Sequence, residues 1–173
     1  MSRIRQLFCL GLVTLAACSP SLDWREYRAD DGGFVVLLPQ KPGRAERRIP
    51  TPAGEVTMHM MSARIGEHVL AAGFADFGRV PDAKLVDAMR DALLRNVAGQ
   101  LSSEKTRGDA GSLDREIVAL GRAGQGKDER AVELRARLLV NGTRYVQLVS
   151  IGSQGSGVSE ADVEMFLASY KPG

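Results

Sequence analysis

The chain has 173 residues, two cysteines and a formal net charge of +2. Its length suits one domain with a substantial core. Arg3 and Arg5 account for the whole positive excess, because the rest of the chain holds equal numbers of basic and acidic residues. Bulk charge therefore points to neither nucleic acid nor another polyanion as a partner.

The first predicted element is an export signal. Arg3 and Arg5 precede a mainly apolar run, Leu7–Ala17, which has the length of a signal-peptide core and is too short to span a bilayer. The run ends in Leu15-Ala16-Ala17-Cys18, directly before a polar stretch. We predict that residues 1–17 are a removed signal peptide, that residues 18–23 are a tether and that residues 24–173 form a single domain. In the alternative interpretation, Cys18 merely follows an ordinary cleavage site of the A-x-A type.

Residues Leu15–Cys18 resemble the lipobox of bacterial lipoproteins. The resemblance implies that Cys18 becomes the N-terminus and carries a diacylglyceryl group and an N-acyl chain, which suffices for stable anchoring because more than one chain is buried. Ser19 stands where an inner-membrane retention signal has aspartate, so the resemblance implies the outer membrane, with the domain facing the periplasm. Since Cys9 leaves with the signal, the mature domain keeps no thiol for a disulfide, a zinc cluster or a nucleophile.

Hairpins dominate the elements predicted next. The three predicted hairpins are Trp24–Tyr27 with Phe34–Leu38, Gly54–Arg64 with Glu67–Phe77, and Glu133–Val140 with Thr143–Ile151. The last is joined by Asn141-Gly142, a dipeptide that suits a type I′ turn, and this register pairs Val140 with Thr143. Arg44–Pro50 is predicted to be an edge strand because of its prolines.

Two helices are predicted by their apolar spacing. The longer one covers Pro81–Gln100, and its apolar stripe consists of Leu85, Val86, Met89, Leu93 and Val97. The shorter one begins with the capping-box pattern Ser159–Asp162 and ends at Pro172-Gly173. Leu101–Ser112 is predicted to be a polar, turn-rich connection, followed by a strand at Ile117–Leu120. The predicted class is α+β, with a mainly antiparallel sheet built from hairpins and both helices packed on it.

This order of elements resembles the PsbP-like fold group, including small DcrB-like bacterial lipoproteins. The resemblance rests on sequence features that span the predicted mature chain: Trp24-x-x-Tyr27, Phe34 running into Leu38-Pro39, Thr51-Pro-Ala-Gly54, the long helix, Asn141-Gly-Thr-Arg-Tyr145 and a closing aromatic helix. It lies in pattern and order and contains no diagnostic residue, so it implies a fold more than an activity.

Two motifs suggest chemistry and are rejected. Gly121–Lys127 has the glycine and lysine spacing of a phosphate-binding P-loop, but Asp128 stands where that motif needs a hydroxyl for magnesium, so we expect no nucleotide. His59 and His68 are the only histidines, and the predicted register pairs His59 with Ala72 and His68 with Ala63. They would then lie about 13 Å apart along the strands, so we expect no shared metal and interpret both as half-exposed strand residues.

Arginines provide the remaining candidate site. Arg135, Arg137 and Arg144 are predicted to lie on the face of the last hairpin opposite its core residues, where they could bind a phosphate, a lipid head group or an acidic segment. Lys41, Arg44, Arg47 and Arg48 form a second basic run beside the predicted edge strand. In the alternative interpretation, both groups are solvated charges that protect a sheet edge.

Three functions remain open at this stage. The leading hypothesis is a non-enzymatic envelope lipoprotein, a binding or assembly module that attaches to the membrane through Cys18 and meets an unknown envelope protein, with no other cofactor. The alternative is a carrier or binder of an anionic lipid or small anion, through the arginine face or through a pocket between helix and sheet. A third is an enzyme that uses dispersed carboxylates such as Asp76, Asp82 and Glu133.

Overall fold

The computed structural model describes residues 22–109, 111–153 and 155–173. The predicted signal peptide, the lipobox Leu15–Cys18 and most of the predicted tether lie outside these residues. In chain order the elements are β1 (Arg25–Ala29), β2 (Phe34–Leu38), β3 (Gly43–Thr51), β4 (Gly54–Ile65), β5 (His68–Asp76), α1 (Ala83–Asn96), β6 (Gln100–Arg107), β7 (Asp114–Ala123), the short helix η1 (Gly126–Asp128), β8 (Arg130–Asn141), β9 (Arg144–Gly152), α2 (Glu160–Ala168) and β10 (Lys171–Pro172).

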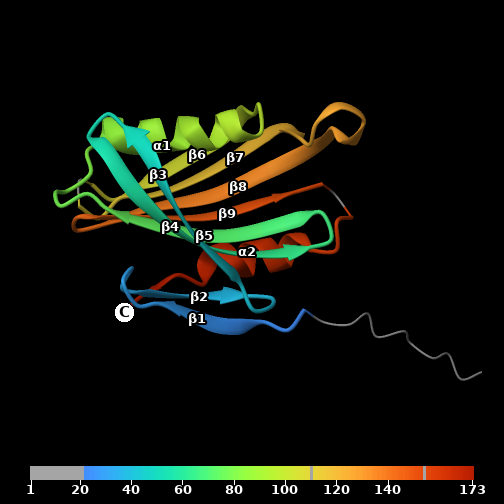
Figure 1. Cartoon of the computed structure of the whole chain (residues 1–173), viewed down its shortest axis with the longest axis horizontal. Coiled ribbons are helices and arrows are strands. Elements are labelled where there is room, and N and C mark those ends of the chain that lie inside the picture. Colours follow the sequence, from blue (N-terminus) through green and yellow to red (C-terminus); the bar gives the residue numbers. More distant parts are fainter. Residues whose placement is uncertain (1–21, 110, 154) are drawn as a thin grey trace, which may run out of the picture.

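Two antiparallel sheets form the framework. The large sheet has seven strands in the order β3-β4-β5-β9-β8-β7-β6, and the small sheet has the order β1-β2-β10. Helix α1 covers one face of the large sheet, whereas α2 and the small sheet lie on the other face (Figure 1). The mainly antiparallel α+β class predicted from the hairpin pattern is therefore confirmed.

Each face of the large sheet has its own hydrophobic core. All five residues of the predicted stripe on α1 are buried, and four of them pack with side chains from β7, β8 and β9. On the other face, Phe34 and Phe166 pack against Leu148, and all three are at most 1% exposed. Complete burial of one such side chain stabilises the fold by about 1.5–3 kcal/mol, so α2 and the small sheet are bound mainly by apolar contacts.

Local signals decide where the helices begin and end. The Asp82 carboxylate accepts a hydrogen bond from the Leu85 amide at 2.9 Å, which begins α1. The helix is shorter than predicted at both ends: Ala98 has a positive φ of 44°, and the Gly99 amide returns to the Leu94 carbonyl at 2.8 Å, so the chain leaves the helix before Gln100. The predicted capping box of Ser159 and Asp162 is present at α2.

Three predicted details were wrong. Leu101–Ser112 was predicted to be a turn-rich connection, yet most of it belongs to the edge strand β6, whose single partner is β7. Its side chains are almost all exposed, which is why it lacks the apolar alternation of a strand.

The two-residue turns of both long hairpins are Gly66-Glu67 and Gly142-Thr143, so Val140 pairs with Tyr145. Each register differs from the predicted one by two residues. Because this number is even, the side chains of both hairpins stay on their predicted faces.

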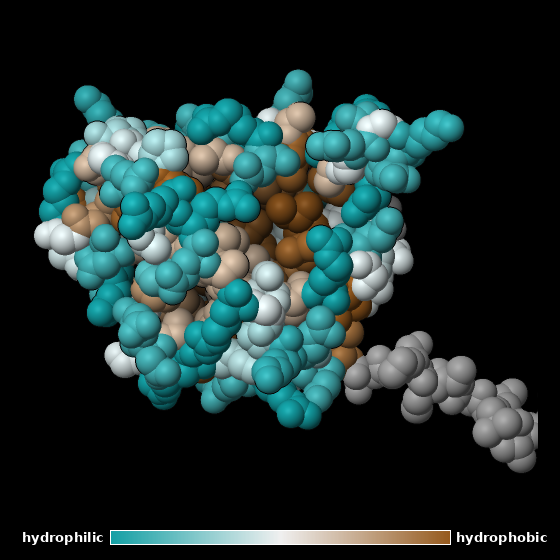
Figure 2. Space-filling model, in the orientation of Figure 1, coloured by the Kyte–Doolittle hydropathy of each residue, from teal (hydrophilic) through white to brown (hydrophobic). Residues whose placement is uncertain are grey.

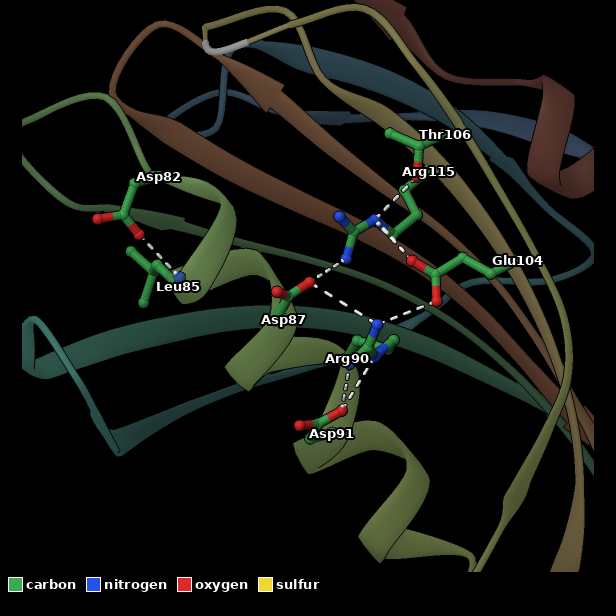
Figure 3. Close-up of polar contacts among 8 residues, drawn as sticks. All are labelled: Asp82, Leu85, Asp87, Arg90, Asp91, Glu104, Thr106 and Arg115. Carbon is green, nitrogen blue, oxygen red and sulfur yellow. Dashed lines mark hydrogen bonds and ion pairs between the residues drawn. The ribbon is translucent and has the colours of Figure 1, made fainter.

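A network of ion pairs ties α1 to the β6–β7 hairpin (Figure 3). The Arg115 guanidinium, 8% exposed, lies 2.5 Å from the Asp87 carboxylate on α1 and 3.2 Å from the Glu104 carboxylate on β6. Arg90 of α1 reaches the same Glu104 at 3.0 Å and also pairs with Asp91 at 2.9 Å. Two cations and three carboxylates therefore hold one side of the helix in a fixed place.

Substitution of Arg115 should cost stability. Arg115→Met keeps most of the side-chain volume but leaves Asp87 and Glu104 without their buried cation, and we expect the free energy of unfolding to fall by about 2–3 kcal/mol. Arg107→Met is the matched control, because Arg107 pairs with Glu116 on the same hairpin but is 64% exposed, and its loss should stay below about 1 kcal/mol. Urea unfolding measures both, and equal losses would show that the network does not hold the helix.

Candidate functional site

Helix α1 bridges a curved sheet and leaves a space beneath it. The helix contacts β3 on one side and β7 and β8 on the other. On a flat sheet β3 and β7 would be about 24 Å apart, more than twice the diameter of a helix, so the sheet must curl around α1. Between the helix and the middle strands β5 and β9 lies a cavity of about 650 Å³. The small side chains of Ala71, Ala88 and Ala92 line it and leave this space unfilled.

The cavity has an apolar floor and a polar rim. Its floor is made of buried residues, namely Met58, Ala71, Met89, Leu93, Gln147 and Val149. Its rim is made of exposed residues, namely Arg47, Pro50, Pro52, Arg95 and Asn96. Figure 2 shows apolar side chains around a hollow between the level of α1 and the β4–β5 hairpin. Concave, mostly apolar cavities of this volume with a few polar groups are typical of small-molecule sites.

The charged residues that line the cavity are both basic. None of the residues that line it is acidic, and no carboxylate of the described chain, which contains every aspartate and glutamate of the sequence, lies within ion-pair distance of Arg47 or Arg95. Strand alternation divides the predicted basic run, because Arg48 turns away from the cavity and pairs with Glu55 at 3.6 Å. Two guanidinium groups therefore face the mouth without an internal partner.

Among the buried residues that line the cavity, Gln147 is the polar one, and it is 5% exposed. Its side-chain oxygen accepts a hydrogen bond from the Tyr145 hydroxyl at 3.1 Å. Tyr145 is completely buried, and this burial raises the pKa of its hydroxyl far above the usual value, so the hydroxyl stays protonated and keeps donating. The amide nitrogen of Gln147 is then the group that the floor can offer to a ligand.

A second, smaller hollow of about 300 Å³ lies on the other face of the sheet, between the β1–β2 turn and strands β3 and β4. His59 lines it, stacked on Phe74 at 4.8 Å between ring centroids and 3.1 Å from the Glu46 carboxylate. Asp30 and Asp31 also line it. Unlike the cavity beneath α1, this hollow has more acidic than basic groups and limited apolar surface.

The two histidines are separate, as predicted, but only His59 is half-exposed. His68 is 6% exposed, and its two ring nitrogens lie 2.8 Å from the hydroxyls of Ser150 and Ser156. The burial lowers the pKa of His68 below its ordinary value. In the described part of the chain, no group of histidine, cysteine, aspartate and glutamate side chains is arranged to hold a metal ion.

The predicted arginine face is divided among internal partners. The Arg135 guanidinium lies 2.6 Å from Glu133 and 2.8 Å from Glu160 of α2, and Arg137 lies 2.9 Å from Asp114. These hydrogen bonds and nearby carboxylates, outweighing burial, raise the pKa of both arginines.

Arg144 lies toward the other end of the hairpin from Arg135 and Arg137, paired across the turn with Asn141 and 3.9 Å from the Asp76 carboxylate. Anion binding at Arg135, Arg137 and Arg144 stays a prediction, but each of the three already has a carboxylate neighbour. The three do not form one open site.

The other predicted sites have structural roles. Gly121–Lys127 joins β7 to β8 through η1, so no α-helix follows it as a P-loop requires. Asp82 caps α1, and Glu133 pairs with Arg135. Asp76 accepts a hydrogen bond from the Gly78 amide at 2.8 Å, which lowers its pKa.

Comparison with known proteins supports the fold. No family model matches the chain, and no curated protein matches it in sequence. Among solved structures, the solution structure of cyanobacterial PsbP (CyanoP) from Synechocystis sp. PCC 6803 matches with a TM-score of 0.56 and 12% sequence identity, covering 92% of this chain and 99% of that one. The chain therefore has a PsbP-like fold, as its pattern predicted. No helix within the described residues is long and apolar enough to cross a membrane.

The buried His68 should make stability fall at mildly acidic pH. The unfolded chain takes up a proton at this histidine near pH 6.5, whereas the folded chain resists it, so stability is lost as the pH falls below about 6.5 toward the lower pKa of the folded state. We expect His68→Gln to reduce the loss of unfolding free energy between pH 7.5 and 5.5, measured by urea unfolding. His59→Gln is the control and should keep the loss. An undiminished loss in His68→Gln would contradict this role.

Proposed function

We propose that the protein is a lipid-anchored, non-enzymatic binding module of the bacterial envelope, and that the cavity beneath α1 is its binding site. The observation that carries this proposal is the cavity itself: about 650 Å³ of open space with an apolar floor. The cavity is open to solvent at its rim, and apolar surface that stays in contact with water forgoes about 25 cal/mol of stabilisation per Å². A retained cavity of this size is best explained by a ligand that fills it.

The anchor is the second part of the proposal. It rests on the lipobox-like residues Leu15–Cys18 and on the signal-peptide pattern before them. A diacylglyceryl group and an N-acyl chain on Cys18 would hold the domain at the outer membrane, facing the periplasm, because several buried chains give stable anchoring. The tether at residues 18–23 reaches no more than about 20 Å, so any partner of the domain would meet it close to the membrane surface.

The cavity also gives the anionic-lipid alternative a better location than the arginine face. Arg135 and Arg137 are paired with carboxylates, whereas Arg47 and Arg95 beside the cavity are not among the ion pairs of the described chain. Binding of an amphiphile beneath α1 is thus compatible with a module that either carries its ligand or responds to it.

The anchor is tested by fractionation of cells that express the full chain. We expect the unaltered protein to sediment with the outer membrane and the Cys18→Ser variant to appear in the soluble fraction, because the variant cannot accept the diacylglyceryl group. Cys9→Ser, which lies in the predicted signal, should leave the distribution unchanged. Soluble export of the unaltered protein would contradict the anchor.

The cavity is tested with the neutral apolar dye N-phenyl-1-naphthylamine, whose fluorescence rises in apolar surroundings. We expect the full chain to bind it and Ala92→Phe, which places an aromatic ring in the cavity, to weaken binding at least tenfold. Ala161→Phe is the control, since Ala161 is exposed on α2. Equal binding by Ala92→Phe and the unaltered chain would show that the dye binds elsewhere.

A further inference from the structure

We infer that the ligand of the cavity is a single long-chain carboxylate, with its chain on the apolar floor and its head group between Arg47 and Arg95. This inference rests on the proposed function, because it names the ligand of that same site. It draws on three properties of the cavity: its volume, the sign of its charge and the position of its rim relative to α1.

The volume fits one acyl chain. A methylene group is about as large as a water molecule, whose share of liquid volume is roughly 30 Å³. The cavity of about 650 Å³ therefore accommodates one chain of sixteen to eighteen carbons, whereas the two chains of a diacyl lipid exceed it. Three methionines, Met58, Met60 and Met89, line it, and their unbranched side chains adapt to a flexible chain at little cost.

The charge selects an anion. Arg47 comes from the edge strand β3 and Arg95 from the last turn of α1, so the two guanidinium groups approach the same cavity from different elements. Both are exposed and no acidic residue lines the cavity, which leaves their charge available to a ligand. A planar guanidinium matches the two oxygens of a carboxylate.

The position of the rim favours a carboxylate over a phosphate. Arg95 and Asn96 stand at the C-terminal end of α1, where the helix dipole carries partial negative charge. Phosphate groups are commonly held by the backbone N–H groups of a helix N-terminus, whereas this end of α1 offers carbonyl oxygens, so the donors at the rim are side chains, which suit the two oxygens of a carboxylate.

The test uses the full chain carrying Cys18→Ser, so that no acyl group of its own competes, and calorimetric titration below micelle concentrations. The probes are dodecanoate, tetradecanoate, hexadecanoate, hexadecanol and hexadecyl phosphate. We expect affinity to rise about fourfold for each added methylene, corresponding to about 0.8 kcal/mol, and hexadecanoate to bind at least tenfold more tightly than hexadecanol.

Variants separate the head-group contacts from the chain contacts. In the double variant Arg47→Ala and Arg95→Ala, the preference for hexadecanoate over hexadecanol should disappear while the dependence on chain length remains. Arg48→Ala is the matched control, because Arg48 lies on the same strand but pairs with Glu55 away from the cavity, and it should bind like the parent.

Each outcome bears on a different part of the reasoning. Equal binding of hexadecanol and hexadecanoate would overturn the inference and leave the binding module intact. Tighter binding of hexadecyl phosphate than of hexadecanoate would overturn the choice of a carboxylate. If none of the chains binds, the cavity is not a ligand site and the proposed function fails with the inference.

Discussion

The ion-pair network between α1 and the β6–β7 hairpin is the constraint on which the rest of the structure depends. Arg115 is almost completely buried, and such a guanidinium is stable only with good carboxylate partners, which Asp87 and Glu104 provide. With one side of α1 fixed in this way, the opposite side must reach β3 across the curled sheet. The apolar stripe of the helix packs with side chains of β7 and β8, while Ala88 and Ala92 beside it leave the space over β5 and β9 open, with Met89 and Leu93 of the stripe at its border. The cavity is thus a consequence of where charge holds the helix.

The sequence predicted the parts of this fold in which apolar residues recur at regular spacing. Alternation along β4, β5, β8 and β9 and the stripe on α1 place side chains on faces, so the α+β class and the core beneath α1 followed from spacing, whereas the core on the other face of the sheet was not predicted. The register of each long hairpin was wrong by two residues. In the last hairpin the turn begins at Gly142, which has a positive φ, and not at Asn141, a choice of turn that the dipeptide does not determine. The strand β6 was missed because an edge strand with polar side chains on both faces carries no apolar signal. Its carboxylate Glu104 is the group of the network that pairs with both Arg90 and Arg115 on the β6–β7 side, so the network could not be predicted either.

The candidate site shows the same limit. A pocket between helix and sheet was among the predictions, and Arg47 was noted within a basic run, yet the arginines chosen first were Arg135, Arg137 and Arg144. Sequence spacing gives the face on which a charge lies but not its partner, and only the three-dimensional arrangement shows that Arg135 and Arg137 meet carboxylates from Glu160 and Asp114. The described chain begins beside β1, on the face of the large sheet opposite α1 (Figure 1). A lipid on Cys18 would therefore hold the small sheet nearest the membrane and leave the cavity on the far side.

The most direct measurement of binding beneath α1 is methyl NMR of methionine-labelled full chain with Cys18→Ser, titrated with hexadecanoate. Met58, Met60 and Met89 line the cavity, whereas Met61 belongs to the core on the other face and Met165 is exposed on α2. Binding in the cavity predicts that the methyl signals of Met58, Met60 and Met89 shift together and saturate, while those of Met61 and Met165 stay in place. Unchanged signals from Met58, Met60 and Met89 in the presence of saturating hexadecanoate, or shifts confined to Met61 and Met165, would contradict it.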